Sequence, residues 1–388
     1  MKQNLYVEWR ASLSSISRDQ WQSCFQRPGF VRSYDFHRLV EQSSPPGVAF
    51  QYLLAWQGDA LLAIISCFRY ELSLAVTATA TIRKLVDRIE RIRPGLFTVP
   101  TFCVGQLTAV CDHLYGLDAL AVSRRETVLR AADQHIRTRA RELGCWLTMV
   151  KEIPTREMDF YRESLGDRYI FVDSLPNALL DFDVDRPYAA QLRSKYRNLY
   201  KKRTRAFAKC GLTWRVVAGS VTRDRAREME QLYARVLARS ENQFERLTAE
   251  FFYQLCARYS RAFALLCLDG DRLVGFSINV EDDDRVCGLY LGYDDPDRRG
   301  EIYFNLMYKV IEVARSRGKG SVQLGQTSYQ VKSALGARPA YTYLGLEAHN
   351  RLLHLLLGRF GADLFPVHPF PERTVFARKE PKPRARIA

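Results

Sequence analysis

The sequence predicts a mixed α/β fold, arranged as two similar domains. At 388 residues the chain is long enough for two domains. In its C-terminal half, strand-like runs at 263–268, 273–280 and 286–293 precede a helix at about 301–316, whose apolar residues recur at helical spacing. Turn residues and glycines that punctuate this half recur in the same order in the N-terminal half, which indicates a duplicated unit.

The order predicted across 262–336 is an antiparallel meander, a helix, a short strand and a short helix. Asp269-Gly270-Asp271 is a strong hairpin signal, and the acidic run at 281–284 marks the next turn. A strand at 321–324 and a helix that stops at Gly336 follow. In a mixed sheet of this kind, the third strand and the strand after the helix can splay apart. The splay frees backbone groups for a pantetheine-like or peptide-like acyl carrier, and the turn before the helix points N–H groups at a phosphate.

The duplication is indicated by a set of turn and helix-end glycines that recur in the same order in both halves. They are Gly58 with Gly270, Gly144 with Gly318, and Gly166 with Gly336. Chance similarity is the alternative, because Gly-Asp turns are common. The predicted domains are residues 1–175 and 176–378, and a disordered basic tail is expected at 379–388.

The remaining elements follow from apolar periodicity and from Gly and Pro breaks. The expected helices are 18–25, 34–41, 82–92, 124–143, 155–165, 188–209, 225–238, 249–260 and 350–360. The expected strands are 50–55, 61–68, 97–104, 146–150, 178–182, 341–346 and 374–377.

Composition narrows the class of protein. A net charge of +15 implies an anionic partner, such as a nucleotide-bearing cofactor, an acidic carrier protein, RNA or a lipid headgroup, with solubility as the alternative. The nine cysteines form no CxxC pair, which indicates reduced thiols in a cytoplasmic protein. No apolar run approaches the length of a membrane span. The six dispersed histidines show no metal-ligand spacing, so no metal is expected.

A basic stretch lies between Pro187 and Thr222. It holds nine basic residues and no acidic one, and an apolar face runs along the predicted helix. A polyphosphate or RNA landing site explains this charge, and a solvated basic face is the alternative. The substrate-binding candidates from this stretch are Arg193, Lys195, Arg197, Lys201 and Lys202.

Several catalytic motifs are absent from the sequence. It contains no GxSxG elbow, Walker loop, GxGxxG or HExxH, and the adjacent Cys111 and His113 are poorly spaced for a thiol nucleophile. These absences favour a reaction that depends on positioning. Direct attack of an amine on an acyl carbonyl is such a reaction, since the enzyme holds both reactants and stabilises the oxyanion.

The run Gly325-Gln326-Thr327-Ser328-Tyr329-Gln330-Val331-Lys332, closing on Leu335-Gly336, resembles the GNAT acyltransferases, and within them the FemAB-like and CelD-like group. The string at 192–197 is similar to the segment that opens the second domain of that group. The resemblance implies two tandem GNAT-like domains packed around a shared cleft. It also implies N-acyl transfer from a thioester, either acyl-CoA or acyl-carrier protein, to a small-molecule amine, with no tightly bound cofactor.

The resemblance implies a catalytic role for Lys332, because a lysine in this helix is part of the FemAB-like pattern. Many GNAT enzymes have a tyrosine at that position to protonate the leaving thiolate. Lys332 could stabilise the oxyanion or simply lie on the helix surface. Tyr329, one turn earlier, could be the proton donor or packing.

The donor loop departs from the GNAT pattern of Arg/Gln-x-x-Gly-x-Gly/Ala. Here the loop is 297–302, with Asp297 at the first position and Ile302 at the last. This departure weakens the expectation of ordinary coenzyme A binding. The candidates for donor binding are Arg298, Arg299, Gly300, Tyr293 and Gln326.

Two other functions remain open. One is an aminoacyl-tRNA-dependent transferase of the peptidoglycan-bridge type, which the resemblance also implies and the basic helix favours. The other is a catalytically dead double-GNAT scaffold, which the degenerate loop favours. The amine, the acyl chain and the oligomeric state are not fixed by the sequence.

Overall fold

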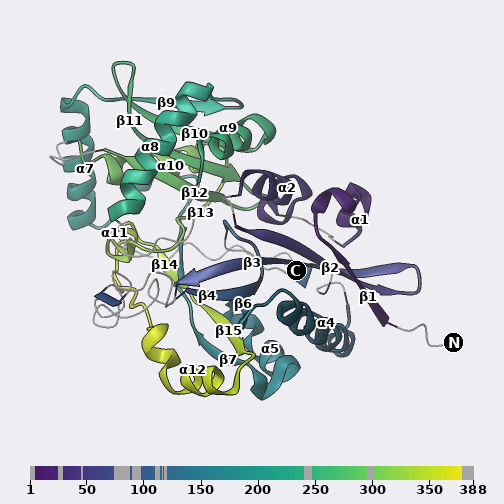
Figure 1. Cartoon of the computed structure of the whole chain (residues 1–388). Coiled ribbons are helices and arrows are strands. Elements are labelled where there is room, and N and C mark those ends of the chain that lie inside the picture. Colours follow the sequence, from purple (N-terminus) through teal and green to yellow (C-terminus); the bar gives the residue numbers. More distant parts are fainter. Residues whose placement is uncertain are drawn as a thin grey trace. The chain divides into compact units, whose positions relative to one another are not determined.

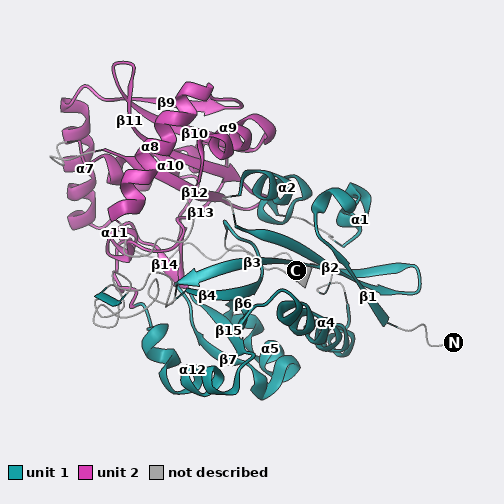
Figure 2. Cartoon of the chain, in the orientation of Figure 1, with its two compact units in different colours: residues 1–175, 341–368 teal, residues 176–340, 369–388 magenta. Residues whose placement is uncertain are grey.

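The computed structural model describes residues 5–24, 29–44, 47–73, 88–89, 98–109, 114–115, 117, 120–239, 247–294 and 300–377. The chain divides into two compact units: residues 1–175 with 341–368, and residues 176–340 with 369–388 (Figure 2). Each unit is built on one mixed β-sheet with helices packed against it (Figure 1). The expected helix at 82–92, apart from residues 88–89, and the expected tail lie outside the described residues.

Unit 1 contains a sheet of strand order β1-β2-β3-β4-β6-β15-β7, with β5 paired to β3. Its strands are β1 (Leu5–Arg10), β2 (Ala49–Gln57), β3 (Ala60–Ser73), β4 (Thr98–Val104), β5 (Leu114–Tyr115), β6 (Leu147–Pro154), β7 (Ile170–Asp173) and β15 (Thr342–Ala348). Its helices are α1 (Arg18–Ser23), α2 (Tyr34–Ser43), α4 (Val122–Glu142), α5 (Met158–Leu165) and α12 (Arg351–Leu364). The apolar stripe that predicts α4 is its buried face, which includes Val128, Ala132, Ile136 and Ala140.

Unit 2 contains a sheet of strand order β14-β8-β13-β12-β11-β10-β9. Its strands are β8 (Asn177–Asp181), β9 (Thr213–Ala218), β10 (Ala262–Asp269), β11 (Arg272–Glu281), β12 (Val286–Tyr293), β13 (Ser321–Gln323) and β14 (Arg338–Ala340). Its helices are α6 (Tyr188–Gln191), α7 (Ser194–Lys209), α8 (Arg223–Arg239), α9 (Ala249–Arg258), α10 (Ile302–Ser316) and α11 (Tyr329–Ala334).

The two sheets repeat one pattern, which confirms the prediction of two similar mixed α/β domains. In each sheet four antiparallel strands are followed by a parallel pair, β4 with β6 and β12 with β13, and then by two antiparallel strands. The matched glycines also agree in conformation: φ is +57° and +58° at Gly58 and Gly270, +68° and +73° at Gly144 and Gly318, and +66° and +95° at Gly166 and Gly336. Glycine adopts this left-handed region without steric cost, which explains its recurrence at these turns and helix ends.

The structure corrects one domain assignment. Residues 341–368, expected in the C-terminal domain, belong to unit 1, because β15 is hydrogen-bonded between β6 and β7. The predicted strand at 374–377 is instead reduced to an isolated bridge between Phe376 and Leu192. The strands β1, β5, β7, β9 and β14 were not predicted from the sequence, and the predicted helix at 188–209 is interrupted between α6 and α7.

No helix in the described part of the chain combines the length and apolar character that a bilayer span requires. Eight cysteines are described, all as free thiols, and all but Cys210 are buried. Cys111 and His113 lie outside the described residues. Within those residues, no group of three or more His, Cys, Asp or Glu side chains is placed to hold a metal ion.

Candidate functional site

A β-bulge interrupts the pairing of β12 with β11. Ile278 pairs with Tyr290 and Asn279 pairs with Gly288, so Leu289 has no counterpart on β11. A bulge of this kind bends its strand and increases the local twist. It therefore turns the second half of β12 away from the path of a regular sheet.

The bulge coincides with the point where β12 and β13 separate. These parallel strands pair only at Val286 with Val322 and at Cys287 with Gln323, although β12 continues to Tyr293. Beyond Gln323 the chain keeps only its pairing with β8 on the opposite edge, where Leu324 N–H donates to the carbonyl oxygen of Ala178. In unit 1, by contrast, β4 is paired with β6 through its last residue. The predicted splay is therefore present in unit 2.

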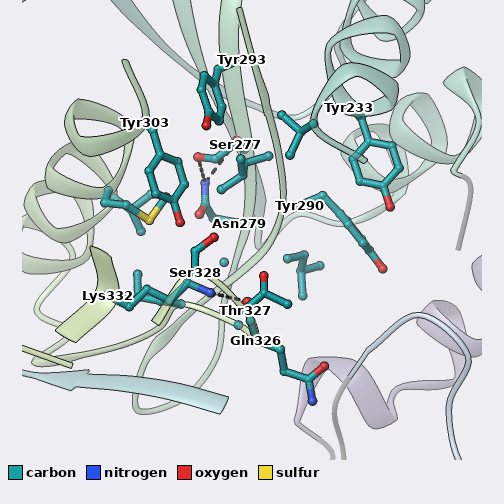
Figure 3. A pocket seen from close by; sticks show the side chains of 18 of the residues that line it. Tyr233, Ser277, Asn279, Tyr290, Tyr293, Tyr303, Gln326, Thr327, Ser328 and Lys332 are labelled. Carbon is teal, nitrogen blue, oxygen red and sulfur yellow. Dashed lines mark hydrogen bonds between the residues drawn. The ribbon is translucent and has the colours of Figure 1, made fainter. Parts of the chain in front are cut away.

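A cavity of about 230 Å³ occupies this opening (Figure 3). Its lining comes from α8, β11, β12, α10, the loop at 324–328 and α11. Figure 3 shows Tyr303 and Lys332 at one side of the cavity, and Tyr233 and Tyr290 at the other. Side chains from both sides therefore face one cavity.

Lys332 is the notable polar residue of this lining. Its side chain is 3% exposed, and Nζ donates a hydrogen bond to the backbone oxygen of Gln326 at 2.5 Å. Burial lowers the pKa of Lys332 from 10.5 to about 7. No described carboxylate forms an ion pair with this amine, so burial is not offset by a counter-charge. A lysine with a pKa near 7 suits either electrostatic stabilisation or proton transfer at neutral pH.

The loop before α11 is strained. Thr327 and Ser328 have φ of +63° and +51°, a region that non-glycine residues rarely adopt, and Gly325 has φ of +73°. Such residues cost of order 1–3 kcal/mol each and cluster at functional sites. Ser328 is held by a hydrogen bond with Tyr303. Burial raises the pKa of the Tyr303 hydroxyl to about 12. This arrangement fixes the backbone carbonyl that receives the Lys332 hydrogen bond.

Two polar residues of β11, Ser277 and Asn279, also line the cavity, and the sequence analysis missed both. The available signal was their alternation within an otherwise apolar strand, which puts both side chains on one face. Asn279 is fully buried and its Nδ2 donates to the backbone oxygen and Oγ of Ser277, at 3.2 and 2.9 Å.

Residues 194–333 match the family described as acetyltransferase (GNAT) domain. The chain carries a GNAT domain. The matched region runs from the start of α7 to the residue after Lys332 and includes every residue that lines the cavity. The GNAT domain makes this protein a transferase and confirms the predicted resemblance. No protein of curated function shows significant sequence similarity to the chain.

Solved structures share the fold over most of the chain. FemX is 10% identical to this chain, and the two structures align over 90% of this chain and 100% of FemX with a TM-score of 0.54. The tandem GNAT protein from the clavulanic acid biosynthesis pathway is 13% identical. It aligns over 89% of this chain and 99% of its own length, with a TM-score of 0.54. A conserved protein of unknown function from Bacteroides thetaiotaomicron is 11% identical. It aligns over 88% of this chain and 100% of its own length, with a TM-score of 0.50. The chain therefore shares its fold with FemX and with the tandem GNAT protein.

The GNAT-domain cavity brings together three of the predicted site residues: Lys332, Gln326 and Tyr293. Tyr293 lies at the end of β12 and stacks on Tyr303, with ring centroids 5.4 Å apart. Gly300 lies outside the lining, where its carbonyl oxygen accepts a hydrogen bond from Asn305 at 3.1 Å. Arg298 and Arg299 fall outside the described residues.

The structure does not bring Tyr329 to the cavity. Its hydroxyl donates to the backbone oxygen of Pro176 at 2.9 Å, and its ring packs on Phe370. Burial raises the pKa of this hydroxyl above its usual range. Of the two roles expected for Tyr329, packing is the one that its contacts with Pro176 and Phe370 favour.

The basic candidates lie on α7 and not in the cavity. Lys195, Lys201 and Lys202 are exposed, and none of them forms an ion pair within the described residues. Arg193 and Arg197 instead donate to the backbone oxygens of Phe376 and Leu192. The helix is anchored to α10 by Arg203, a residue that the sequence analysis did not single out. Its guanidinium lies 3.3 Å from the ring centroid of Phe304 and 3.5 Å from the carboxylate of Glu301.

Proposed function

We propose that this protein is an N-acyltransferase that moves an acyl group from a thioester donor, acyl-CoA or an acyl-carrier protein, to an amine of a small molecule. The observation that carries the proposal is the opening between β12 and β13, with Lys332 buried at its edge. A GNAT domain supplies the reaction class. The identity of the two substrates is the proposed part.

The separated strands suit a thioester donor. The β13 side of β12 has backbone N–H and C=O groups that no strand of the described residues occupies beyond Cys287. An extended pantetheine arm carries amide groups that can pair with such an edge, as an added strand would. The arm would then place its thioester near the Lys332 amine. The acceptor amine would approach from the side of Tyr233 and Tyr290 (Figure 3).

The proposed reaction needs no covalent intermediate on the enzyme. The neutral amine attacks the thioester carbonyl, forming the C–N bond and a tetrahedral oxyanion, and collapse breaks the C–S bond to release thiolate. The ammonium of Lys332 stabilises the oxyanion, a contact worth about 2.7–4 kcal/mol in comparable sites. Lys332 can then protonate the thiolate, since its pKa lies near 7. The proton lost by the amine passes to solvent.

A second donor class, aminoacyl-tRNA, is favoured by one specific observation. The segment 188–221, which contains α7, has nine basic residues and no acidic one, and several of its lysines are exposed without an ion-pair partner in the described residues. Such a surface suits a phosphate backbone. The non-catalytic scaffold is less favoured, because a scaffold gains nothing from the unfavourable burial of Lys332.

Mass spectrometry of ligands retained through a native purification tests the proposal. The expected result is a pantetheine-containing molecule or acylated carrier protein, displaced by excess coenzyme A. Recovery of RNA instead, with transferase activity in the extract abolished by ribonuclease, would replace the thioester donor by aminoacyl-tRNA. A Lys332→Met variant purified in parallel separates donor binding from catalysis, since it should retain the same ligand and lose turnover.

A further inference from the structure

The orientation of the Asn279 amide is fixed by Ser277. Its Nδ2 donates to two oxygens of that residue, the backbone carbonyl and Oγ. The opposite orientation would place Oδ1 against a carbonyl oxygen, which cannot donate a hydrogen bond. Oδ1 is therefore the atom left over, and it is buried with no hydrogen-bond partner.

An unpaired buried carbonyl is costly in the free protein, and native structures contain few. A leucine of similar size at position 279 would avoid the cost. Elsewhere in the lining Ser328 is bonded to Tyr303, and the Lys332 amine has one acceptor, the Gln326 oxygen. This pattern points to an acceptor that is satisfied only when a ligand is bound.

Asn279 lies where the opening begins. It pairs with Gly288, the first residue of β12 beyond its contacts with β13. A Cβ at position 288 would lie 3.5 Å from Oδ1 and 3.3 Å from the backbone oxygen of Gln323, so glycine keeps this space free. Figure 3 shows the amide oxygen of Asn279 on the side of Ser328 and Lys332.

We propose that Asn279 is a specificity-determining residue of this site: its side-chain carbonyl oxygen accepts a hydrogen bond from an N–H group of the bound acyl donor. The inference rests on the proposed function and adds to it a chemical requirement. A plain acyl group has no hydrogen-bond donor. The N–H comes either from a pantetheine amide or from an amino group on the acyl chain itself.

Binding of three non-transferable probes distinguishes these sources without relying on turnover. The probes are coenzyme A, S-acetonyl-coenzyme A and S-(3-amino-2-oxopropyl)-coenzyme A, and the last two differ by a single amino group. Their dissociation constants are measured by calorimetry for wild type and for Asn279→Leu. Loss of a hydrogen bond that leaves a buried donor unpaired should weaken binding roughly 5- to 100-fold.

Equal weakening of all three probes by Asn279→Leu would assign the hydrogen bond to pantetheine. Weakening of the amino probe alone would assign it to the acyl chain and identify an aminoacyl donor. Wild-type affinity for every probe in the folded variant would overturn the inference while leaving the thioester function intact. Failure of wild type to bind any probe would overturn acyl-CoA as the donor and this inference together.

Ser277→Ala keeps the test decisive if Asn279→Leu does not fold. This variant removes one of the two acceptors that orient Nδ2 and leaves the backbone oxygen in place. A loss of roughly 2- to 5-fold, with the same pattern among the probes, is expected. Thermal unfolding of Ser277→Ala at the wild-type temperature excludes a general disturbance of the fold, and unchanged affinities in that variant would overturn the inference.

Discussion

Lys332 Nζ lies 2.5 Å from the backbone oxygen of Gln326 and donates a hydrogen bond to it. The contact joins α11 to the strained loop that borders the opening between β12 and β13. It provides one acceptor for a buried amine that could use three, so the remaining N–H groups are available to a ligand oxygen. This single hydrogen bond holds Lys332 in place and leaves its other N–H groups available to a ligand.

Lys332→Met should stabilise the protein, and the gain should depend on pH. Burial lowers the folded-state pKa from 10.5 to about 7, so the unfolded chain binds more protons than the native state between these values. Wild-type stability therefore rises from pH 7 to 10.5. The excess stability of the variant should be largest below pH 7, of the order of several kcal/mol, and should vanish above pH 10.5. Urea unfolding at a series of pH values measures it.

Lys309→Met is the matched control for that experiment. Lys309 lies on α10 and pairs with Glu312 at the surface, 3.1 Å away. Its loss should change stability by less than about 1 kcal/mol with little pH dependence over this range. A stability difference for Lys332→Met that stays constant between pH 6 and 10.5 would show that the amine is not desolvated.

Tyr329→Phe should leave the transfer rate within about threefold of wild type, because its hydroxyl is bonded to Pro176 outside the cavity. Loss of that bond should cost about 1 kcal/mol of stability. Tyr303→Phe should instead lower the rate by up to roughly 10²-fold, since it releases Ser328 and with it the loop that positions Lys332. Steady-state kinetics of both variants checks the contrast, and the reverse order would restore Tyr329 as the proton donor.

Gly292→Ala should destabilise the protein and disturb the cavity. A Cβ at this position would lie 2.6 Å from backbone atoms of Leu232 and Tyr233, so α8 must move away from β12. Overpacking of this kind costs about 1–3 kcal/mol. Gly358→Ala, within α12, meets no atom closer than 3.7 Å and should stabilise by about 0.5–1 kcal/mol. Thermal unfolding of the pair tests the prediction, and equal effects would contradict it.

The exposed lysines of α7 should contribute to binding the anionic part of the donor. Reversing the charge at Lys201 and Lys202 should weaken donor binding and reduce its dependence on log[salt] by about two units if both contact phosphates. Arg272→Glu, at the β10–β11 turn, serves as the charge-matched control for each single reversal, Lys201→Glu or Lys202→Glu. Wild-type binding that does not change between 50 and 300 mM salt, roughly a twofold change in Debye length, would exclude this role.

Local signals predicted most of the fold. The three strands of the meander, α10 and α11 follow from turn residues and apolar periodicity, which act over a few residues. The position of β15 in unit 1 could not be predicted, because it depends on pairing with β6 and β7, far earlier in the chain. The strand β1 was missed for a similar reason, since its pairing partner β2 is about 40 residues away.

The candidate site was only partly predictable. Lys332 was found through a family resemblance, and its burial depends on the packing of a six-residue helix that periodicity does not resolve. Tyr329 shares that helix but turns to Pro176, which sequence spacing cannot show. The alternation of Ser277 and Asn279 could have placed Asn279 on the polar face of β11, but its unpaired oxygen has no signature in one strand. It arises from the registers of β11, β12 and β13 together.

The dependence of kcat on pH for wild type and Lys332→Met tests the central claim most directly. If the Lys332 ammonium stabilises the oxyanion, the wild-type kcat falls as pH rises through about 7, where this lysine loses its proton. The variant should be roughly 10²–10³ slower below pH 7, insensitive to that transition, and unchanged in donor affinity. A variant that keeps near-normal kcat, or a wild-type rate that rises through pH 7 as for a general base, would contradict the account.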